Sequence, residues 1–247
     1  MQDKFVADVG DYGKYGLLRA LCGLTGSEAS DQLSLGIVWY FVRDRGIGYL
    51  DDPDSFRDSD PEVFDALLRI VNDSQRSVAS IALSRVFPAR TVFFPEAVPT
   101  QLGDRKEWLQ RALESTKDCE LVFLDPDNGL TSGSLGDGSI SSKHVYYEEL
   151  KRFLGQVVPT GQSVVIYHHL PRKRAEDHIQ TLRTEMARAL KLPEEPWALL
   201  YRRFTLRAYF IIPHRHHRNA LRERINRFLD GPWGQNRREG PHFQRVS

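Results

Sequence analysis

The sequence predicts an α/β domain whose mostly parallel sheet ends in an antiparallel strand pair. Three apolar runs stop abruptly at polar, turn-forming residues: Leu33–Val42, Leu121–Leu124 and Ser163–Tyr167. Strands buried on both faces have this continuous apolar character, and amphipathic helical segments separate the runs, as in α/β folds. Two further apolar stretches, Trp197–Tyr201 and Leu206–Ile212, lie close together in the chain and predict the antiparallel pair.

Length and composition are those of one ordinary domain. The 247 residues are 40% hydrophobic and 27% charged, and no apolar run approaches the roughly 20 residues that a membrane helix needs. The N-terminus lacks the apolar segment of a signal peptide. Cys22 and Cys119 show no metal-ligand spacing and are expected to be reduced core residues. We therefore expect a single domain over 1–247, cytoplasmic and without a membrane partner.

The net charge is only +1, but the charged residues are distributed unevenly along the chain. From Tyr167 onward, 17 lysine and arginine residues stand against 8 acidic ones, whereas the preceding part holds 17 against 25. This basic C-terminal third predicts a surface for a polyanion, with nucleic acid as the leading candidate. The alternative is a set of solvated helix faces. The expected phosphate contacts are Arg172, Lys173, Arg174, Arg202, Arg203, Arg207 and Arg215.

Near the N-terminus, three glycines at positions 10, 13 and 16 approach a helix that is expected to start at about Tyr15, with Asp11 as its N-cap. A glycine-rich approach exposes backbone N–H groups, so it predicts an anion or cofactor cradle with Lys14 as the charged contact. The spacing matches neither a P-loop nor a G-x-G-x-x-G turn.

The first apolar run ends in a charged turn that contains Asp44. An acid at this place can accept a hydrogen bond from a ribose hydroxyl or an amine. Helical spacing and capping residues then predict three helices, and β-branched and aromatic residues predict a short strand. The helices are expected at Pro61–Val71, Ser77–Val86 and Asp104–Ser115, and the strand at Thr91–Phe94.

The strongest constellation follows the second and third apolar runs. Asp125, Asp127 and Asn128 come directly after the second, and His168 and His169 directly after the third. If the two strands are parallel neighbours, both polar groups lie at one edge of the sheet, where α/β folds bind ligands. The glycine- and serine-rich segment 131–142 is expected to be a mobile loop over this site.

The C-terminal third completes the expected order of elements. A helix is expected to begin at Ser142, a basic helix to lie within 171–192, and a last helix to span Asn219–Leu229. The tail Pro232–Ser247 is polar and is expected to be loosely held. The histidines and arginines at 214–218 favour a basic surface or a helix-end feature over a metal site.

This order of elements, with the segment LVFLDPDNGL at its centre, resembles that of the Rossmann-like S-adenosylmethionine-dependent methyltransferases. It is nearest the large-subunit ribosomal RNA adenine-N6 methyltransferases, which begin with a glycine-containing helical segment. In that family an Asp- or Asn-Pro-Pro-aromatic tetrad closes the fourth strand and grips the target amine. Asp125 and Pro126 match the tetrad, whereas Asp127 and Asn128 replace its second proline and its aromatic residue.

The resemblance implies a doubly wound, Rossmann-like sheet, S-adenosylmethionine as cofactor, and methyl transfer to a base amine of nucleic acid. Asp125 would accept hydrogens from that amine, and no metal is implied. The residues that it implies around the cofactor are Gly10, Asp11, Gly13, Lys14 and Asp44.

Two alternatives stay open. Asp125, Asp127 and His168 or His169 could hold Mg or Mn, which would activate water against a phosphodiester, with Lys14 as a phosphate contact. Adjacent residues of an extended chain point to opposite sides, so only one of the two histidines is expected to face the site. The other alternative is a non-catalytic nucleic-acid-binding module on a methyltransferase-like fold.

Overall fold

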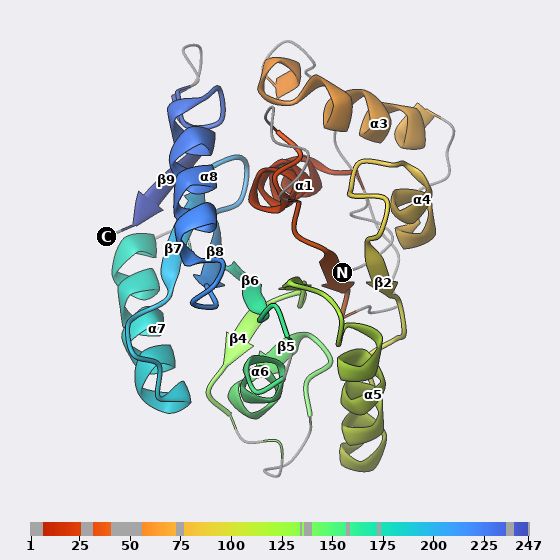
Figure 1. Ribbon diagram of the computed structural model, residues 1–247, viewed down its shortest axis with the longest axis vertical. Helices are drawn as coiled ribbons and strands as arrows, with labels where there is room; N and C mark the ends of the chain where they lie inside the picture. Colours follow the sequence, from red (N-terminus) through yellow and green to blue (C-terminus); the bar gives the residue numbers. More distant parts are fainter. Residues whose placement is uncertain are drawn as a thin grey trace.

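A seven-stranded sheet organises the computed structural model of the protein (Figure 1). The structure describes residues 7–25, 32–40, 56–72, 77–133, 135, 140–156, 159–171, 174–235 and 240–246. In their order across the sheet, the strands are β2 (Val92–Phe94), β1 (Leu35–Val38), β3 (Leu121–Leu124), β6 (Ser163–His169), β8 (Arg207–Ile212), β7 (Trp197–Tyr201) and β9 (Phe243–Val246).

The sheet is mostly parallel, as predicted. β1 pairs in parallel with β2 and with β3, and β3 pairs in parallel with β6. β8 runs antiparallel to both β6 and β7, so β7 has the direction of β6. Leu124 is in register with Ile166, which places Asp125 at the level of Tyr167. The two polar groups that follow the apolar runs therefore share one edge of the sheet.

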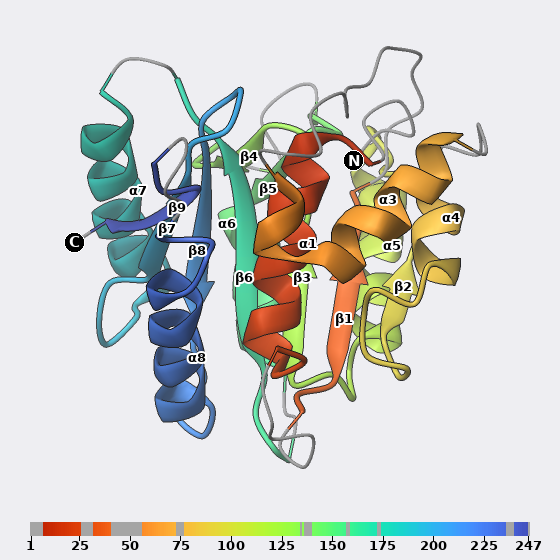
Figure 2. The ribbon, with the colours of Figure 1, turned by 90° about the horizontal axis from the view of Figure 1, so that it is seen from above.

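Helices cover both faces of the sheet (Figures 1 and 2). On one face lie α1 (Val9–Cys22), α3 (Pro61–Asn72), α4 (Val78–Leu83) and α8 (Arg218–Asp230), with the short 3-10 turn η3 (Arg57–Ser59) before α3. On the other face lie α5 (Leu102–Ser115), α6 (Tyr147–Leu154) and α7 (Ala175–Leu190). Successive side chains of β3 join opposite cores: Phe123 packs with the first group of helices, and Val122 and Leu124 with the second.

A second, two-stranded parallel ladder was not expected from the sequence. It pairs β4 (Gly129–Thr131) with β5 (His144–Tyr146), and β5 occupies residues that the sequence assigns to the start of a helix. Residues 134 and 136–139 of the glycine-rich segment expected as a mobile loop lie outside the described residues. The ladder is fastened to α5 because Arg105 donates to the carbonyl of His144 and forms a buried ion pair with Glu149 in α6.

The C-terminal tail differs most from its prediction. It was expected to be loosely held, but Phe243 and Val246 are buried and β9 pairs antiparallel with β7. The pair of β7 and β8 is antiparallel as predicted, yet β9 adds the edge strand, so that pair does not end the sheet. The sequence FQRV does not indicate a strand, because a four-residue strand between polar segments carries little periodicity.

The remaining predictions concern single elements. Helices at the positions of α3, α5, α7 and α8 are confirmed. Cys22 and Cys119 are buried, free thiols, as expected. Across the part of the chain that the structure describes, no helix has both the length and the apolar character needed to cross a membrane.

Candidate active site

A buried lysine joins two carboxylates at the edge of the sheet where the parallel strands end. The Nζ atom of Lys14, in α1, lies 2.9 Å from Oδ1 of Asp11 and 2.8 Å from Oδ2 of Asp125. Asp11 is in the first turn of the same helix, and Asp125 is the first residue after β3. All three residues are at most 5% exposed. This triad, Asp11, Lys14 and Asp125, is the centre of the candidate site.

Electrostatics explains why a lysine is tolerated there. Burial alone would lower the pKa of Lys14, but the two carboxylates outweigh burial and hold that pKa above its usual value. Burial also raises the pKa values of Asp11 and Asp125, although Lys14 opposes the rise. With both carboxyl groups ionised, the triad carries one negative charge more than Lys14 neutralises. The raised pKa values of the two carboxyl groups favour uptake of a further proton.

Aromatic rings surround the ammonium group. It lies 5.8 Å from the ring centroid of Tyr15 and 5.7 Å from that of Tyr167, distances at which a cation is attracted to the ring face. The Tyr209 hydroxyl is also buried and finds no hydrogen-bond partner in the described part of the chain. Burial comes first among the causes that raise its pKa. These tyrosines exclude water and strengthen the charge interactions of the triad.

The glycine-rich stretch is helix, not a loop. α1 begins at Val9 and its N-cap is Asp8, which accepts a hydrogen bond from the Asp11 N–H at 2.8 Å. The predictions of a start at Tyr15 and of an Asp11 cap are therefore wrong. Cβ atoms built at Gly10 and Gly13 would lie 2.4 Å from Arg207 and 2.5 Å from Tyr201. The glycines let α1 pack closely on β7 and β8, and their N–H groups form no open cradle.

A second ion pair adjoins the triad. Nη2 of Arg207 lies 3.7 Å from Oδ2 of Asp8. The Arg207 side chain is 11% exposed, so little of this predicted phosphate contact is open to solvent. Aspartates and the lysine recur at 8, 11 and 14, a helical spacing that could have indicated one charged helix face.

Asp127 and Asn128 lie farther out than Asp125. Oδ2 of Asp127 is 3.6 Å from Nζ of Lys143, and Asn128 is exposed. The backbone of Asn128 connects both ladders, since its N–H donates to the carbonyl of Lys143 and its carbonyl accepts from the N–H of His169. These residues present polar side chains at the outer rim of the site.

The two adjacent histidines have different surroundings, as the strand geometry predicted. His168 is buried, and its Nδ1 accepts the N–H of Leu130 at 3.0 Å. Neutral His168 therefore carries its proton on Nε2, which lies 3.2 Å from Nε2 of His178. Burial is the first cause that lowers the pKa of His168, to about 3. In this state its Nε2 donates a hydrogen bond and has no lone pair for a metal.

His169 is exposed at the end of β6. Desolvation first, then Arg207, lowers its pKa, and Asp127 opposes this effect. Among the described residues there is no group of three or more histidine, cysteine or acidic side chains arranged to hold a metal ion. The proposed ligands Asp125, Asp127 and His168 each face a different partner: Lys14, Lys143 and His178.

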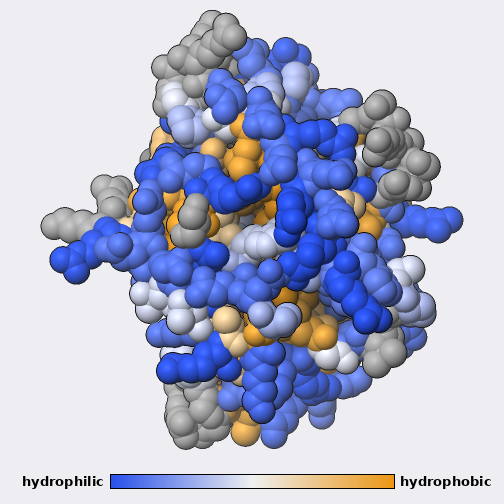
Figure 3. Space-filling model, turned by 60° about the vertical axis from the view of Figure 1, so that its left-hand side comes forward, coloured by the Kyte–Doolittle hydropathy of each residue, from blue (hydrophilic) through white to orange (hydrophobic). Residues whose placement is uncertain are grey.

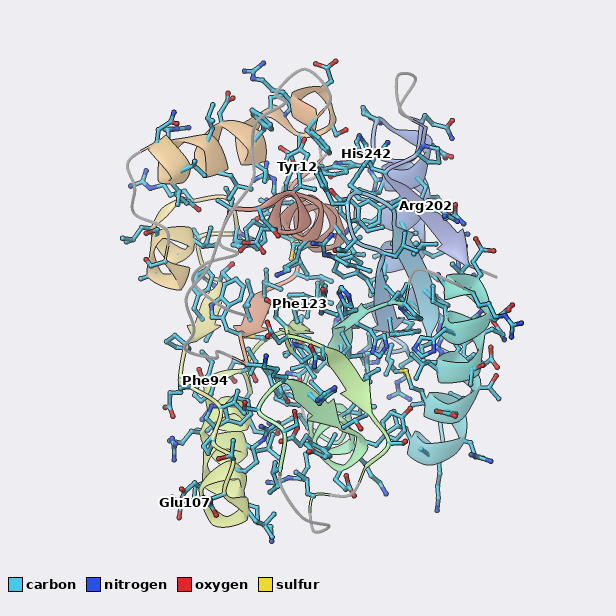
Figure 4. All side chains as sticks on the ribbon, turned by 180° about the vertical axis from the view of Figure 1, so that it is seen from behind. Tyr12, Phe94, Glu107, Phe123, Arg202 and His242 are labelled. Atoms are coloured by element: carbon cyan, nitrogen blue, oxygen red, sulfur yellow. The ribbon has the colours of Figure 1, made fainter. Side chains whose placement is uncertain are left out.

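The expected nucleic-acid contacts are dispersed. Arg172, Lys173 and the expected cofactor contact Asp44 lie outside the described residues. Arg174 and Arg215 are exposed. Arg202, labelled in Figure 4 with His242, pairs with Glu176 at 2.7 Å, and Arg203 donates to Nδ1 of His242 at 2.6 Å.

The histidines at 214–217 form a helix-end feature, as expected. His217 is the N-cap residue of α8 and its Nδ1 lies 3.0 Å from the Ser163 hydroxyl. This pairing fastens the start of α8 to the start of β6, at the edge of the sheet opposite the triad. Comparison of the whole chain with protein-family models, curated proteins and solved structures gave no match.

Proposed function

We propose that the protein is a methyltransferase that transfers a methyl group from S-adenosylmethionine to a base amine of nucleic acid. The order of strands supports a doubly wound, Rossmann-like interpretation of the sheet. From β1 the chain moves to β2 on one side, and it later returns to β3 on the other side. Such a reversal opens a crevice outside the carboxyl ends of the two strands, where open α/β sheets bind ligands.

The observation that carries the proposal is the contact of Lys14 with both Asp11 and Asp125 at this crevice. Asp125 follows β3 directly, the place that the methyltransferase tetrad occupies in the family that the sequence resembles. Carboxylates are suitable partners for a cofactor whose sulfonium and amino groups are positive. Asp11 would face these cations, Asp125 would face the target amine, and Lys14 would fix the orientation of both carboxylates.

S-adenosylmethionine, when bound, supplies a methyl group on a positively charged sulfur. Asp125 would accept a hydrogen bond from the target amine, directing the nitrogen lone pair at the methyl carbon. The amine would lose one proton on methylation, and Asp125 would take it up. Because burial raises the pKa of Asp125, this carboxylate is a better proton acceptor than an exposed aspartate.

The test separates cofactor binding from chemistry. Calorimetric titration of the wild-type protein with S-adenosylmethionine is expected to give a micromolar Kd, and Asp11→Asn is expected to weaken binding because it removes a negative charge. Asp125→Asn should keep cofactor binding within a few-fold, yet reduce transfer of labelled methyl groups to RNA or DNA by about 10²- to 10⁴-fold.

Asp65→Asn is the matched control, since Asp65 is an exposed aspartate paired with Arg57 on the surface of α3. It should leave both measurements unchanged. No binding of the cofactor by the wild-type protein would overturn the proposal. Manganese binding that is lost in Asp127→Asn, with no cofactor binding, would favour the metal-dependent phosphodiesterase instead.

A further inference from the structure

The hairpin between β7 and β8 presents an aromatic side chain to solvent. Tyr201 and Arg207 are the last cross-strand pair, and Phe204 lies in the turn between them. Phe204 is 69% exposed. Within the described part of the chain the other exposed large hydrophobic residues are Leu83 and Leu102, so Phe204 is the only aromatic among them.

The backbone at Phe204 is strained and firmly held. Its φ of 58° lies in the left-handed region, which is costly for a bulky residue and is found mainly where surrounding structure enforces it. Here Arg207 enforces it, because Nη1 donates to the carbonyls of Arg203 and Thr205 at 3.1 and 3.0 Å. Arg203 in turn donates to the Gly240 carbonyl. The ring is thus presented from a pre-organised turn.

A second aromatic ring supports Phe204 from beneath. Phe56 lies 6.4 Å from it, centroid to centroid, with an interplanar angle of 23°. Phe56 is buried, and its carbonyl accepts the hydroxyl of Tyr12 in α1 at 2.5 Å. The exposed ring therefore rests on a part of the structure that is anchored to the core.

The hairpin projects at the same end of the sheet as the triad. Figure 2 shows the turn between β7 and β8 at the end of the sheet where α1 begins. A chain of polar contacts joins the two: Arg207 meets Asp8, whose carboxylate accepts the N–H of Asp11, and Asp11 pairs with Lys14. A ligand on the hairpin would thus lie on the side of the molecule that carries the candidate active site.

The residues on the N-terminal side of Phe204 are cationic. Arg202 and Arg203 precede it directly, and Arg202 is exposed. A protein partner would be expected to meet a contiguous apolar patch. The adjoining side of the molecule, with α7, α8 and β9, is predominantly hydrophilic, and polar residues separate its apolar areas (Figure 3). An exposed ring beside an exposed arginine instead suits a nucleobase with an adjacent phosphate, for which Arg202 would exchange its ion pair with Glu176.

We infer that Phe204 is a stacking platform for an unpaired base of single-stranded nucleic acid, with Arg202 at an adjacent phosphate. The inference rests on the nucleic-acid substrate of the proposed function and deepens it. It assigns to the hairpin the aromatic surface that the segment Asp125–Asn128 lacks, since Asp127 and Asn128 stand where the related tetrad has proline and an aromatic residue.

The test is fluorescence anisotropy with labelled 12-nucleotide single strands of RNA and DNA, without cofactor. Phe204→Gly removes the ring and tolerates the positive φ, so the turn is retained. We expect this variant to bind roughly 10- to 100-fold more weakly than the wild type. Phe204→Trp should retain binding, and the fluorescence of the new indole should be quenched when the strand is added.

Leu83→Ala is the control, because Leu83 is exposed on α4 and should not alter binding. Wild-type affinity in Phe204→Gly, no quenching in Phe204→Trp, or no binding of either strand by the wild-type protein would overturn the platform. Titration with S-adenosylmethionine distinguishes failure of the stacking platform from failure of the methyltransferase proposal. Cofactor binding without strand binding removes the platform alone, and Phe204-dependent strand binding without cofactor binding removes the methyltransferase alone.

Discussion

Nζ of Lys14 lies 2.8 Å from Oδ2 of Asp125, although 111 residues separate them in the chain. The contact joins the first turns of α1 to the end of the central strand β3. Both side chains are buried, so the energy of the pair depends on each charge keeping its partner. The same contact that defines the candidate site therefore also stabilises the packing of α1 on the sheet.

Replacing Lys14 should show this dependence. Lys14→Met leaves Asp11 and Asp125 buried without their cation, and we expect the free energy of unfolding at pH 8 to fall by about 3–5 kcal/mol. Burial already raises the pKa of both carboxyl groups, and the loss of Lys14 raises them further. Groups with a raised folded-state pKa favour folding at low pH and lose this contribution as pH rises. Urea denaturation should therefore show a smaller loss at pH 5 than at pH 8.

The matched control is Lys117→Met, which breaks an exposed pair with Glu114. Exposed pairs contribute little, so a change below about 1 kcal/mol is expected. An equal loss at pH 5 and pH 8 in Lys14→Met would contradict the role assigned to the two buried carboxyl groups.

The position of the candidate site could be predicted because a continuous apolar run in the sequence indicates a strand that is buried on both faces. The run Leu121–Leu124 is apolar at every position because β3 is covered on both faces. The side chains that follow it could then be placed at the carboxyl edge without any knowledge of tertiary contacts. The shared edge of Asp125 and His168 followed from the same rule.

The partners within the site were not predictable in this way. Nothing local to Lys14 indicates a bond to Asp125, because that contact depends on how α1 crosses the sheet. The glycines of α1 looked like a loop because glycine is a poor helix former. Their packing against Arg207 and Tyr201 outweighs that propensity. Phe204 carried no sign in the sequence because exposure of a hairpin residue is a tertiary property.

The pH dependence of stability should report on His168. Burial is the first cause of its lowered pKa, about 3 against an ordinary 6.5. A histidine with a lowered folded-state pKa contributes stability that is fully present above pH 6.5 and is lost as pH falls toward 3. His168→Gln, which keeps an acceptor for the Leu130 N–H, should lose less stability than the wild type between pH 6.5 and 4.

Urea denaturation across this pH range measures the free energy of unfolding of both proteins. The buried carboxyl groups contribute equally to both, so their opposite pH dependence cancels in the difference. His216→Gln serves as the control, since His216 is exposed before α8; it should follow the wild-type curve. Parallel curves for wild type and His168→Gln would show that His168 is not held neutral by burial.

Two glycine substitutions should have opposite effects although both add the same methyl group to a helix. Gly13→Ala places a Cβ 2.5 Å from the ring of Tyr201, which is fixed by the bond of its hydroxyl to the Val9 carbonyl. We expect a loss of about 1–3 kcal/mol from overpacking. Gly103→Ala in α5 meets no atom within 4 Å and should gain about 0.4–1 kcal/mol.

Thermal and chemical denaturation of both variants measure these changes. The Gly103 variant is the control for helix propensity, because it gains the same preference without the contact. A stabilised Gly13→Ala variant would mean that α1 does not approach β7 as closely as the glycine packing requires.

A double-mutant cycle on Arg105 and Glu149 should show how the small ladder is fastened to α5. The guanidinium of Arg105 donates two hydrogen bonds to the carboxylate of Glu149: Nε lies 2.5 Å from Oε1, and Nη2 lies 2.8 Å from Oε2. Both side chains are at most 1% exposed. Arg105→Met leaves Glu149 buried without a cation and should cost about 3–5 kcal/mol. Adding Glu149→Met should recover part of this loss, since an apolar pair replaces an uncompensated charge.

The exposed pair of Arg111 and Glu96 is the control. Measured by urea denaturation in the same double-mutant cycle, its coupling energy should be less than about 1 kcal/mol. A coupling energy for Arg105 and Glu149 as small as that of the exposed pair would exclude a dry ion pair at this position.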